Sequence, residues 1–342
     1  MKRLRAIVLT HEDLIPPDSR EGLSPEEIQP WKTEFDVAST LRDLGHEVQV
    51  LGVSHDLPPI RDLVEGWEAD IVFNLLMEFR DVGAFQAHVA SYLELLGVPF
   101  TGCNSLGIQL SRDKALSKKL LLHHGVPTPR FSVFPRGRPV RPRGDPERPL
   151  IVKSVDEEAS LGISQASVVT SREKLVERVE FVHDSVGSDA LVEEYVPGRE
   201  LTLSVLGNQR LMTFPPWELF FENLPEGSLP IATARAKFDL AYQRRVGIDS
   251  GPARDLPAGL PGSLARIARR IYRVLGLSGY ARLDLRLTPE SEIFVIEANA
   301  TPDVAADEDF ARAAREAGLT YPRLLQRILN LGLAWRPSWK ND

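Results

Sequence analysis

The chain has 342 residues, of which 43% are hydrophobic and 26% charged, and a formal net charge of −7. Because a single hydrophobic core rarely extends beyond about 250–300 residues, the length predicts two or three domains. The acidic balance argues against a nucleic-acid partner, since phosphate binding needs a basic face. No apolar stretch approaches the ~20 residues that span a bilayer, so no membrane partner is expected.

The cysteine content and the first residues predict a cytoplasmic protein. Cys103 is the single cysteine, so no internal disulfide can form, which fits a reducing compartment. Residues 1–10 hold a short apolar run among basic residues, but His11, Glu12 and Asp13 end it too early for a signal peptide. We interpret this run as the first strand.

The first hundred residues alternate short β-branched runs with longer helical patterns, which predicts right-handed crossovers and a mostly parallel sheet. Between the first strand and the first helix, the segment Pro16–Pro30 is too long for a simple connection. Loops of this length are either lids and substrate contacts or surface excursions, and both remain open. The predicted elements are strand 4–9, helix 32–44, strand 47–53, helix 58–66, strand 70–74 and helix 83–96.

The middle of the chain is predicted to form a compact α+β lobe. A helix capped by Ser111 should run to His124 and stop at Gly125. A stiff, exposed segment rich in proline and arginine follows at 135–149. The remaining elements of this lobe are strand 150–154, a small-residue loop at 159–164, a strand near 166–169 and a helix near 171–184.

From Ala190 onwards strands dominate the pattern, followed by a helix at 263–275 and a hairpin. A final helix should begin at Thr320, because four apolar residues recur there at helical spacing. Neither internal repeats nor low-complexity tracts interrupt this pattern. The apolar residues of the final helix are Leu324, Leu325, Ile328 and Leu329.

The hairpin carries a candidate metal site. Its strands are 281–287 and 293–299, joined by a turn at 288–291. Strand residues two apart share a face, so Glu297 and Asn299 lie together, and antiparallel pairing brings Asp284 alongside them. Hard oxygen ligands of this kind suit Mg²⁺. The alternative is the ordinary polar face of a half-exposed hairpin.

Two lysines are candidate phosphate ligands. Lys153 ends an apolar strand and is followed by the small-residue run 160–164, which offers close-approaching backbone N–H groups. Lys114 stands at the start of a helix. The run 191–200 leaves a strand through a turn, where backbone groups could bind a base and Glu200 could accept from ribose hydroxyls. A structural turn, a solvated lysine and an edge strand are the respective alternatives.

In this order, the features resemble the ATP-grasp superfamily, specifically its D-alanine–D-alanine ligase branch. The resemblance extends from about Phe100 to Leu331. It rests on Phe100-Thr101-Gly102-Cys103, Asp113-Lys114, Val152-Lys153, Ser160-Leu161-Gly162, the run from Glu193 to Glu200, Ala281-Arg282-Leu283-Asp284 and Glu297-Ala298-Asn299.

The resemblance implies an ATP-grasp fold of α/β and α+β type. An N-terminal parallel-sheet (preATP-grasp) domain would occupy 1–112. A small central lobe at 113–190 and a C-terminal lobe at 191–342, which holds the metal site, would enclose the nucleotide.

The resemblance also implies a nucleotide site. Lys114 and Lys153, with Ser160 and Gly162 of the small-residue loop, would contact the phosphates of ATP. The 191–200 run would supply the adenine and ribose contacts, with Glu200 on the ribose. The adenine contacts would come from Glu193, Glu194 and Val196.

For catalysis, the resemblance implies Asp284, Glu297 and Asn299 as ligands of Mg²⁺ or Mn²⁺. Arg282 would stabilise the transferring phosphoryl group, and Lys237 would contact phosphate from a mobile lid. Such a site would activate a small-molecule carboxylate as an acylphosphate and pass it to an amine, releasing ADP and phosphate. The alternatives are an ATP-grasp kinase and a nucleotide-binding regulator without turnover. The resemblance further implies a possible homodimer.

The residues that read the substrates in D-alanine–D-alanine ligases differ here. The Gly-Gly-x-Ser-x-Glu pattern is absent, and the serine expected after the metal asparagine falls among 305–309. Both substrates therefore remain open. We hypothesise that Asp156, Glu157 and Glu158 face an amino or basic substrate, with plain solvent exposure as the alternative. The replaced family motifs are His-Gly by Leu75-Leu76-Met77-Glu78, paired serines by Ala159-Ser160, and Pro-Gly by Pro302-Asp303.

Overall fold

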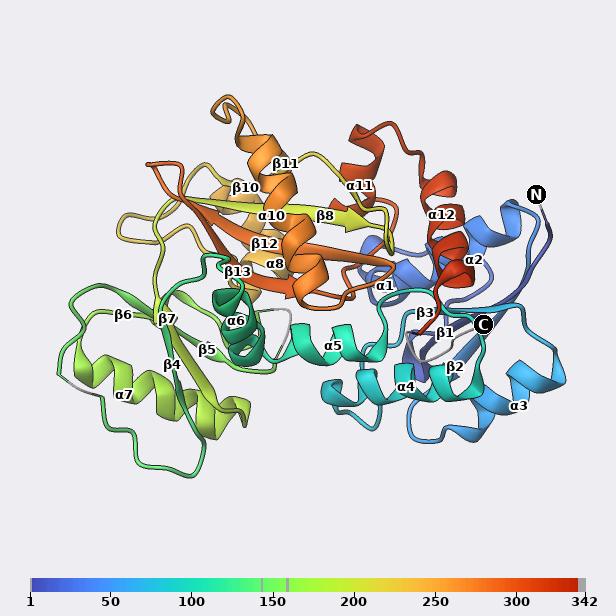
Figure 1. Ribbon diagram of the computed structural model, residues 1–342, viewed down its shortest axis with the longest axis horizontal. Coiled ribbons are helices and arrows are strands. Elements are labelled where there is room, and N and C mark those ends of the chain that lie inside the picture. The colour runs from blue at the N-terminus through green and yellow to red at the C-terminus, as the bar shows by residue number, and fades with distance from the viewer. Residues whose placement is uncertain (1, 143, 158–159, 338–342) are drawn as a thin grey trace.

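The computed structural model describes residues 2–142, 144–157 and 160–337, and its strands form three sheets (Figure 1). Glu158 and Ala159 lie outside the described residues. Within them, no helix is long and apolar enough to cross a membrane. The boundaries 1–112, 113–190 and 191–342 stay a prediction.

The N-terminal sheet has the order β2-β1-β3 and is parallel throughout, as predicted. Each predicted helix of this region is present, with small shifts at the ends. The segment Pro16–Pro30, which had no predicted structure, contains the short helix α1. The elements are β1 (Arg5–His11), α1 (Pro25–Ile28), α2 (Lys32–Asp43), β2 (Glu47–Val53), α3 (Pro58–Gly66), β3 (Ile71–Asn74) and α4 (Gln86–Leu96).

The predicted helix from Ser111 to His124 is wrong as a single element. The chain forms α5 (Ser105–Arg112) and α6 (Lys114–His123), which meet at Asp113. The Asp113 backbone is extended and its side chain accepts from Leu116 N at 2.8 Å, so it caps α6. Ser111 instead donates back to the Ile108 carbonyl inside α5.

The central sheet has the order β4-β7-β5-β6, and all its strands pair antiparallel. The strand predicted near 166–169 is only two residues long, because a 3₁₀ turn occupies Gln165–Ser167. The helix predicted at 171–184 ends as an α-helix at Phe181 and continues as a π-helical turn to Val186. The elements are β4 (Phe131–Phe134), β5 (Leu150–Ser154), β6 (Val168–Val169), α7 (Arg172–Phe181) and β7 (Ala190–Glu194).

The C-terminal sheet has the order β11-β10-β8-β12-β13, with β9 paired to β8. Two helices, α8 and α9, interrupt the region that was predicted to be strand-dominated. The elements are β8 (Arg199–Leu206), β9 (Met212–Thr213), β10 (Trp217–Phe221), α8 (Ala234–Phe238), α9 (Leu240–Val246), β11 (Ile248–Pro252), α10 (Leu260–Val274), β12 (Tyr280–Leu287), β13 (Ile293–Asn299), α11 (Asp309–Glu316) and α12 (Tyr321–Ala334).

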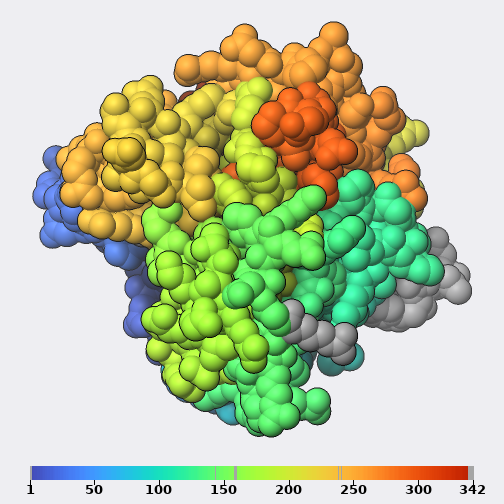
Figure 2. Space-filling view, turned by 90° about the vertical axis from the view of Figure 1, so that its left-hand side faces the viewer, coloured from blue at the N-terminus to red at the C-terminus, as the bar shows by residue number. Residues whose placement is uncertain are grey.

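Residue alternation in β8 and β12 determines which face of this sheet carries the site. Leu201, Leu203, Leu283 and Leu285 are buried in a core shared with α10, which lies along the sheet (Figure 1). The residues between these leucines must point to the opposite face. That face lines a cavity together with residues of the central sheet. In Figure 2 the green residues of the middle of the chain adjoin the yellow and orange residues that follow them.

The final helix packs on the N-terminal sheet. Leu324, Leu325 and Ile328 of α12 share a core with Val37 and Leu41 of α2. The predicted apolar face of this helix is therefore confirmed, and its partner comes from the beginning of the chain.

Candidate active site

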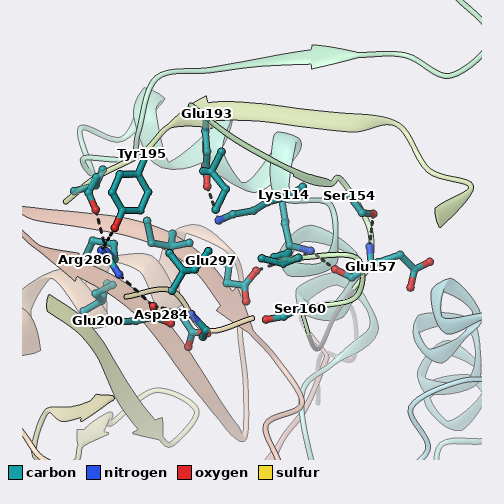
Figure 3. A pocket seen from close by; sticks show the side chains of 18 of the residues that line it. Lys114, Ser154, Glu157, Ser160, Glu193, Tyr195, Glu200, Asp284, Arg286 and Glu297 are labelled. Carbon is teal, nitrogen blue, oxygen red and sulfur yellow. Dashed lines mark hydrogen bonds and ion pairs between the residues drawn. The ribbon is translucent and has the colours of Figure 1, made fainter. Parts of the chain in front are cut away.

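A cavity lies between the central and C-terminal sheets, and most of the predicted site residues line it (Figure 3). Three predicted residues are outside this lining: Gly162, Arg282 and Asn299. The predicted residues that the fold brings together are Lys114, Lys153, Ser160, Glu193, Glu194, Val196, Glu200, Lys237, Asp284 and Glu297.

One wall of the cavity contains a buried ion cluster. Glu193 on β7 is only 1% exposed and lies 2.5 Å from Lys153 Nζ on the neighbouring strand β5. Its other carboxylate oxygen lies 2.8 Å from Nζ of Lys118 on α6. Burial would raise the pKa of Glu193, but the two lysines outweigh burial and hold this pKa below its usual value. Both carboxylate oxygens of Glu193 are thus paired with lysines.

Lys118 and Lys153 have opposite pKa shifts in this cluster. Burial lowers the pKa of Lys118, and Glu193 offsets it only partly. Burial also acts to lower the pKa of Lys153, but Glu193 and Glu297 together raise it above its usual value. Lys153 therefore stays charged at neutral pH, as a phosphate ligand must.

Lys114 stands at the first turn of α6, where its backbone N–H donates to Val155 O at 3.0 Å. Its ammonium donates to the Glu157 carbonyl and lies 3.9 Å from Glu297 Oε2. These contacts direct a positive charge toward the β12–β13 hairpin (Figure 3).

The hairpin register confirms one part of the sequence-based geometry. Asp284 and Glu297 face each other directly across β12 and β13, whereas Asn299 pairs with Arg282. Arg282 holds both oxygens of Asp284, with nitrogen–oxygen distances of 2.7 and 3.0 Å. Asn299 Oδ1 accepts from Thr301 N at 2.8 Å.

Glu297 is strongly stabilised as a carboxylate. Burial would raise its pKa, but Lys114, Lys237 and Lys153, in that order, outweigh burial and hold the pKa at about 2. An oxygen donor that is ionised at any physiological pH suits a hard cation or a site that must balance several lysines.

The far end of the cavity is organised by Arg286, which the sequence reasoning missed. This arginine on β12 is directly opposite Glu200 on β8 and donates to Glu200 Oε2 at 3.2 Å. It also donates to the carbonyls of Val196 and Pro230 at 3.0 and 2.8 Å. Burial raises the pKa of Glu200, and Arg286 opposes this rise.

Lys118 was also missed, although both residues carry a sequence signal. Lys118 lies four residues after Lys114, a spacing that puts the two on one helix face. Arg286 lies two residues after Asp284 in the same strand, so the two share a face of the sheet.

Two loops close over the cavity. Ser160 in the small-residue loop has a positive φ of 61°, and Gly162 one of 72°. Gln165, just beyond this loop, exchanges two hydrogen bonds of 2.9 Å with the backbone of Leu229. The segment after Leu229 leads into α8, which carries Lys237. The predicted lid lysine therefore lies on an element tied to the central lobe.

Asp156 and Glu157, the acidic residues before the loop that the structure describes, both make contacts within the protein. Asp156 accepts from the hydroxyls of Ser154 and Ser188, which hold it within its own lobe. Glu157 offers its carbonyl to Lys114, and its side chain turns away from that lysine (Figure 3). A substrate role for Glu157 stays a prediction.

Comparison with known proteins places this geometry in a family. The profile described as "D-ala D-ala ligase C-terminus" matches residues 120–330. An uncharacterized protein (y4sG) of Sinorhizobium fredii is 33% identical over 321 residues, which cover 90% of each chain. The D-alanine–D-alanine ligase of Synechococcus sp. (strain JA-2-3B'a(2-13)) is 30% identical, again over 90% of each chain.

Solved structures share the fold. The D-alanine–D-alanine ligase of Bacillus anthracis complexed with ATP has a TM-score of 0.72 at 22% identity, covering 96% of this chain and 97% of that one. The VanG D-Ala:D-Ser ligase of Enterococcus faecalis has a TM-score of 0.67 at 20% identity, covering 97% of this chain and 100% of that one. The ATP-grasp fold and the class of ATP-dependent ligases that form C–N bonds are thus confirmed, and the chain belongs to the D-alanine–D-alanine ligase family.

Proposed function

We propose that the protein joins a small-molecule carboxylate to an amine at the expense of ATP, through an acylphosphate. The observation that carries the proposal is the convergence of Lys114, Lys153, Asp284 and Glu297 on one cavity between two sheets. These groups come from separate elements of two lobes. Family membership favours this reaction over the kinase alternative.

The residues present fit a divalent cation. Asp284 and Glu297 face each other across the hairpin and offer carboxylate oxygens, the donors that Mg²⁺ prefers. Asn299 would complete the set through its amide oxygen, two residue pairs further along the hairpin. Bound Mg²⁺, or Mn²⁺, would offset phosphate charge during transfer. The role of Arg282, which holds Asp284 at two points, is to fix that carboxylate and to add a positive charge.

In the first step, a substrate carboxylate oxygen attacks the γ-phosphorus of ATP, and the bond to the β–γ bridging oxygen breaks. Negative charge accumulates on the oxygens around phosphorus as ADP leaves. Lys114, Lys153 and Lys237, which all line the cavity, supply positive charges that offset this negative charge. The product of this step is an acylphosphate.

In the second step, an amine attacks the acyl carbon, the bond to the phosphate oxygen breaks, and the nitrogen gives up a proton. Water would hydrolyse the intermediate if it entered. The contact between Gln165 and Leu229 supports a closed state that keeps water out. The products are an amide or peptide, ADP and phosphate.

D-alanine is the first substrate to test, because the relatives named above are D-alanine–D-alanine ligases and a D-Ala:D-Ser ligase. On the side of the site where the amine would bind, this chain has a residue that differs from the family pattern. Asp303, which stands where the family has glycine, accepts from Thr33 Oγ1 and Ala305 N, both at 2.8 Å. We propose that the amine differs from that of the relatives. A homodimer and a cytoplasmic location stay predictions.

Hydroxylamine tests the reaction, because it converts an acylphosphate to a stable hydroxamate. Purified protein is incubated with ATP, Mg²⁺, hydroxylamine and D-alanine or other small amino acids. We expect hydroxamate with at least one carboxylate, and none with Asp284→Asn. Phosphate transfer to a hydroxyl without hydroxamate would favour the kinase alternative and refute the proposal.

A further inference from the structure

Arg286 lines the nucleotide cavity but has no part in the two chemical steps above. It is 5% exposed and lies on β12, two residues beyond Asp284. Besides Glu200 and two carbonyls, its guanidinium donates to Tyr195 Oη at 3.2 Å, and its carbon lies 5.4 Å from the centre of the Tyr195 ring. All these partners belong to other elements (Figure 3).

These partners join three segments. Tyr195 and Val196 belong to the connection between the central and C-terminal sheets. Glu200 belongs to β8, and Pro230 to the segment that leads into the lid helix α8. A guanidinium is planar and rigid, so it fixes its acceptors relative to one another more tightly than an ammonium can.

The contacts of Glu200 leave one of its oxygens available. Arg286 and the backbone N–H of Ala232 both donate to Oε2, at 3.2 and 3.3 Å. Among the described residues, no hydrogen bond engages Oε1. The Glu200 side chain is 21% exposed and lines the cavity, so Oε1 can accept from a ligand hydroxyl.

We propose that Arg286 is a positioning residue for the nucleoside end of the site. It holds Glu200 in place for the ribose hydroxyls, and it holds the Val196 backbone and the lid segment at fixed distances from that carboxylate. This inference rests on the proposed function. Its consequence is specific: Arg286 contributes to binding energy that depends on the ribose hydroxyls.

The test measures equilibrium binding of three nucleotides to the full-length protein: ATP, 2′-deoxy-ATP and 3′-deoxy-ATP, each with Mg²⁺. The variants are R286M, which keeps an unbranched apolar stem but removes all donors, and R286K, which keeps the charge. E200Q is the matched variant, since it removes the carboxylate charge and leaves Arg286 and its carbonyl partners in place. The melting temperature without nucleotide reports any general loss of structure.

We expect wild type to prefer ATP over at least one deoxy analogue. R286M should weaken ATP binding by about 10- to 100-fold, the range for one or two charge-assisted hydrogen bonds. Its binding of that analogue should change much less, so the preference collapses. E200Q should lose the same preference, and the double variant should lose no more than either single variant.

Equal binding of the three nucleotides by wild type would overturn the inference. A preference for ATP over the deoxy analogue that is retained in R286M would also overturn the inference. If R286M does not fold, a full preference in R286K together with a retained preference in E200Q would overturn it. Failure of folded wild type to bind ATP at all would overturn the proposed function itself. The two failures are therefore distinguishable.

Discussion

Replacing Glu193 by glutamine removes a carboxylate that lies between two buried ammonium groups. At distances of 2.8 Å from Lys118 and 2.5 Å from Lys153, each attraction amounts to about 6–7 kcal/mol at an effective dielectric constant of ~20. Desolvation has already offset much of this gain in the folded protein. In the glutamine variant the buried lysine charges lose their partner, which should lower the free energy of unfolding by about 3–5 kcal/mol.

The measurement is urea unfolding followed by fluorescence and circular dichroism. Lys118→Met is the informative second variant, because it removes one of the two ammonium groups and leaves Glu193 paired with Lys153. Combining it with Glu193→Gln should be less destabilising than the sum of the single effects by more than about 1 kcal/mol. Asp62→Asn is the matched control, because its ion pair with Arg61 is exposed and should contribute little to stability.

Additivity of Lys118→Met and Glu193→Gln within about 0.5 kcal/mol would refute this reasoning. It would mean that the charges of Lys118 and Glu193 do not stabilise one another. A small effect of Glu193→Gln, similar to that of Asp62→Asn, would contradict the assigned burial.

Three further predictions concern other parts of the fold. Glu34→Gln should stabilise the protein by about 1 kcal/mol at pH 7–8, because burial raises the pKa of Glu34 and penalises its charged form; the gain in melting temperature should fade as the pH falls and Glu34 takes up a proton. Gln165→Ala removes two hydrogen bonds to Leu229, in the segment that leads into α8, and should raise the KM for ATP by about 10-fold in steady-state assays. Gly198→Ala should lower the free energy of unfolding by more than about 2 kcal/mol, because its Cβ would lie 2.1 Å from the Leu287 carbonyl oxygen; Gly227→Ala, with no atom within 4 Å, is the control.

The sequence predicted the features that depend on local periodicity. Alternating strands and helices predicted a mostly parallel sheet, which the structure forms in the order β2-β1-β3. Strand pairing about one turn predicted that Asp284 lies beside Glu297. A hairpin constrains its own register, so two carboxylates on its strands can be aligned without knowledge of the rest of the fold.

Features that depend on contacts between distant segments were missed. Lys118 and Arg286 matter because of Glu193 and Glu200. These carboxylates reach them only when α6 packs near β7 and when β12 pairs with β8. The role of Asp113 as a helix cap was missed because Ser111, two residues earlier, has an equally good capping side chain. Local pattern alone does not choose between the two.

The central claim is that Asp284, Glu297 and the lysines form a site for a magnesium nucleotide. Isothermal titration calorimetry of wild type, Asp284→Asn and Glu297→Gln with ATP, in Mg²⁺ and in EDTA, tests it most directly. We predict one bound ATP per chain in Mg²⁺ and at least about tenfold weaker binding in EDTA and in both variants. Absence of binding to wild type, or equal affinity of all three proteins in Mg²⁺ and in EDTA, would contradict the account.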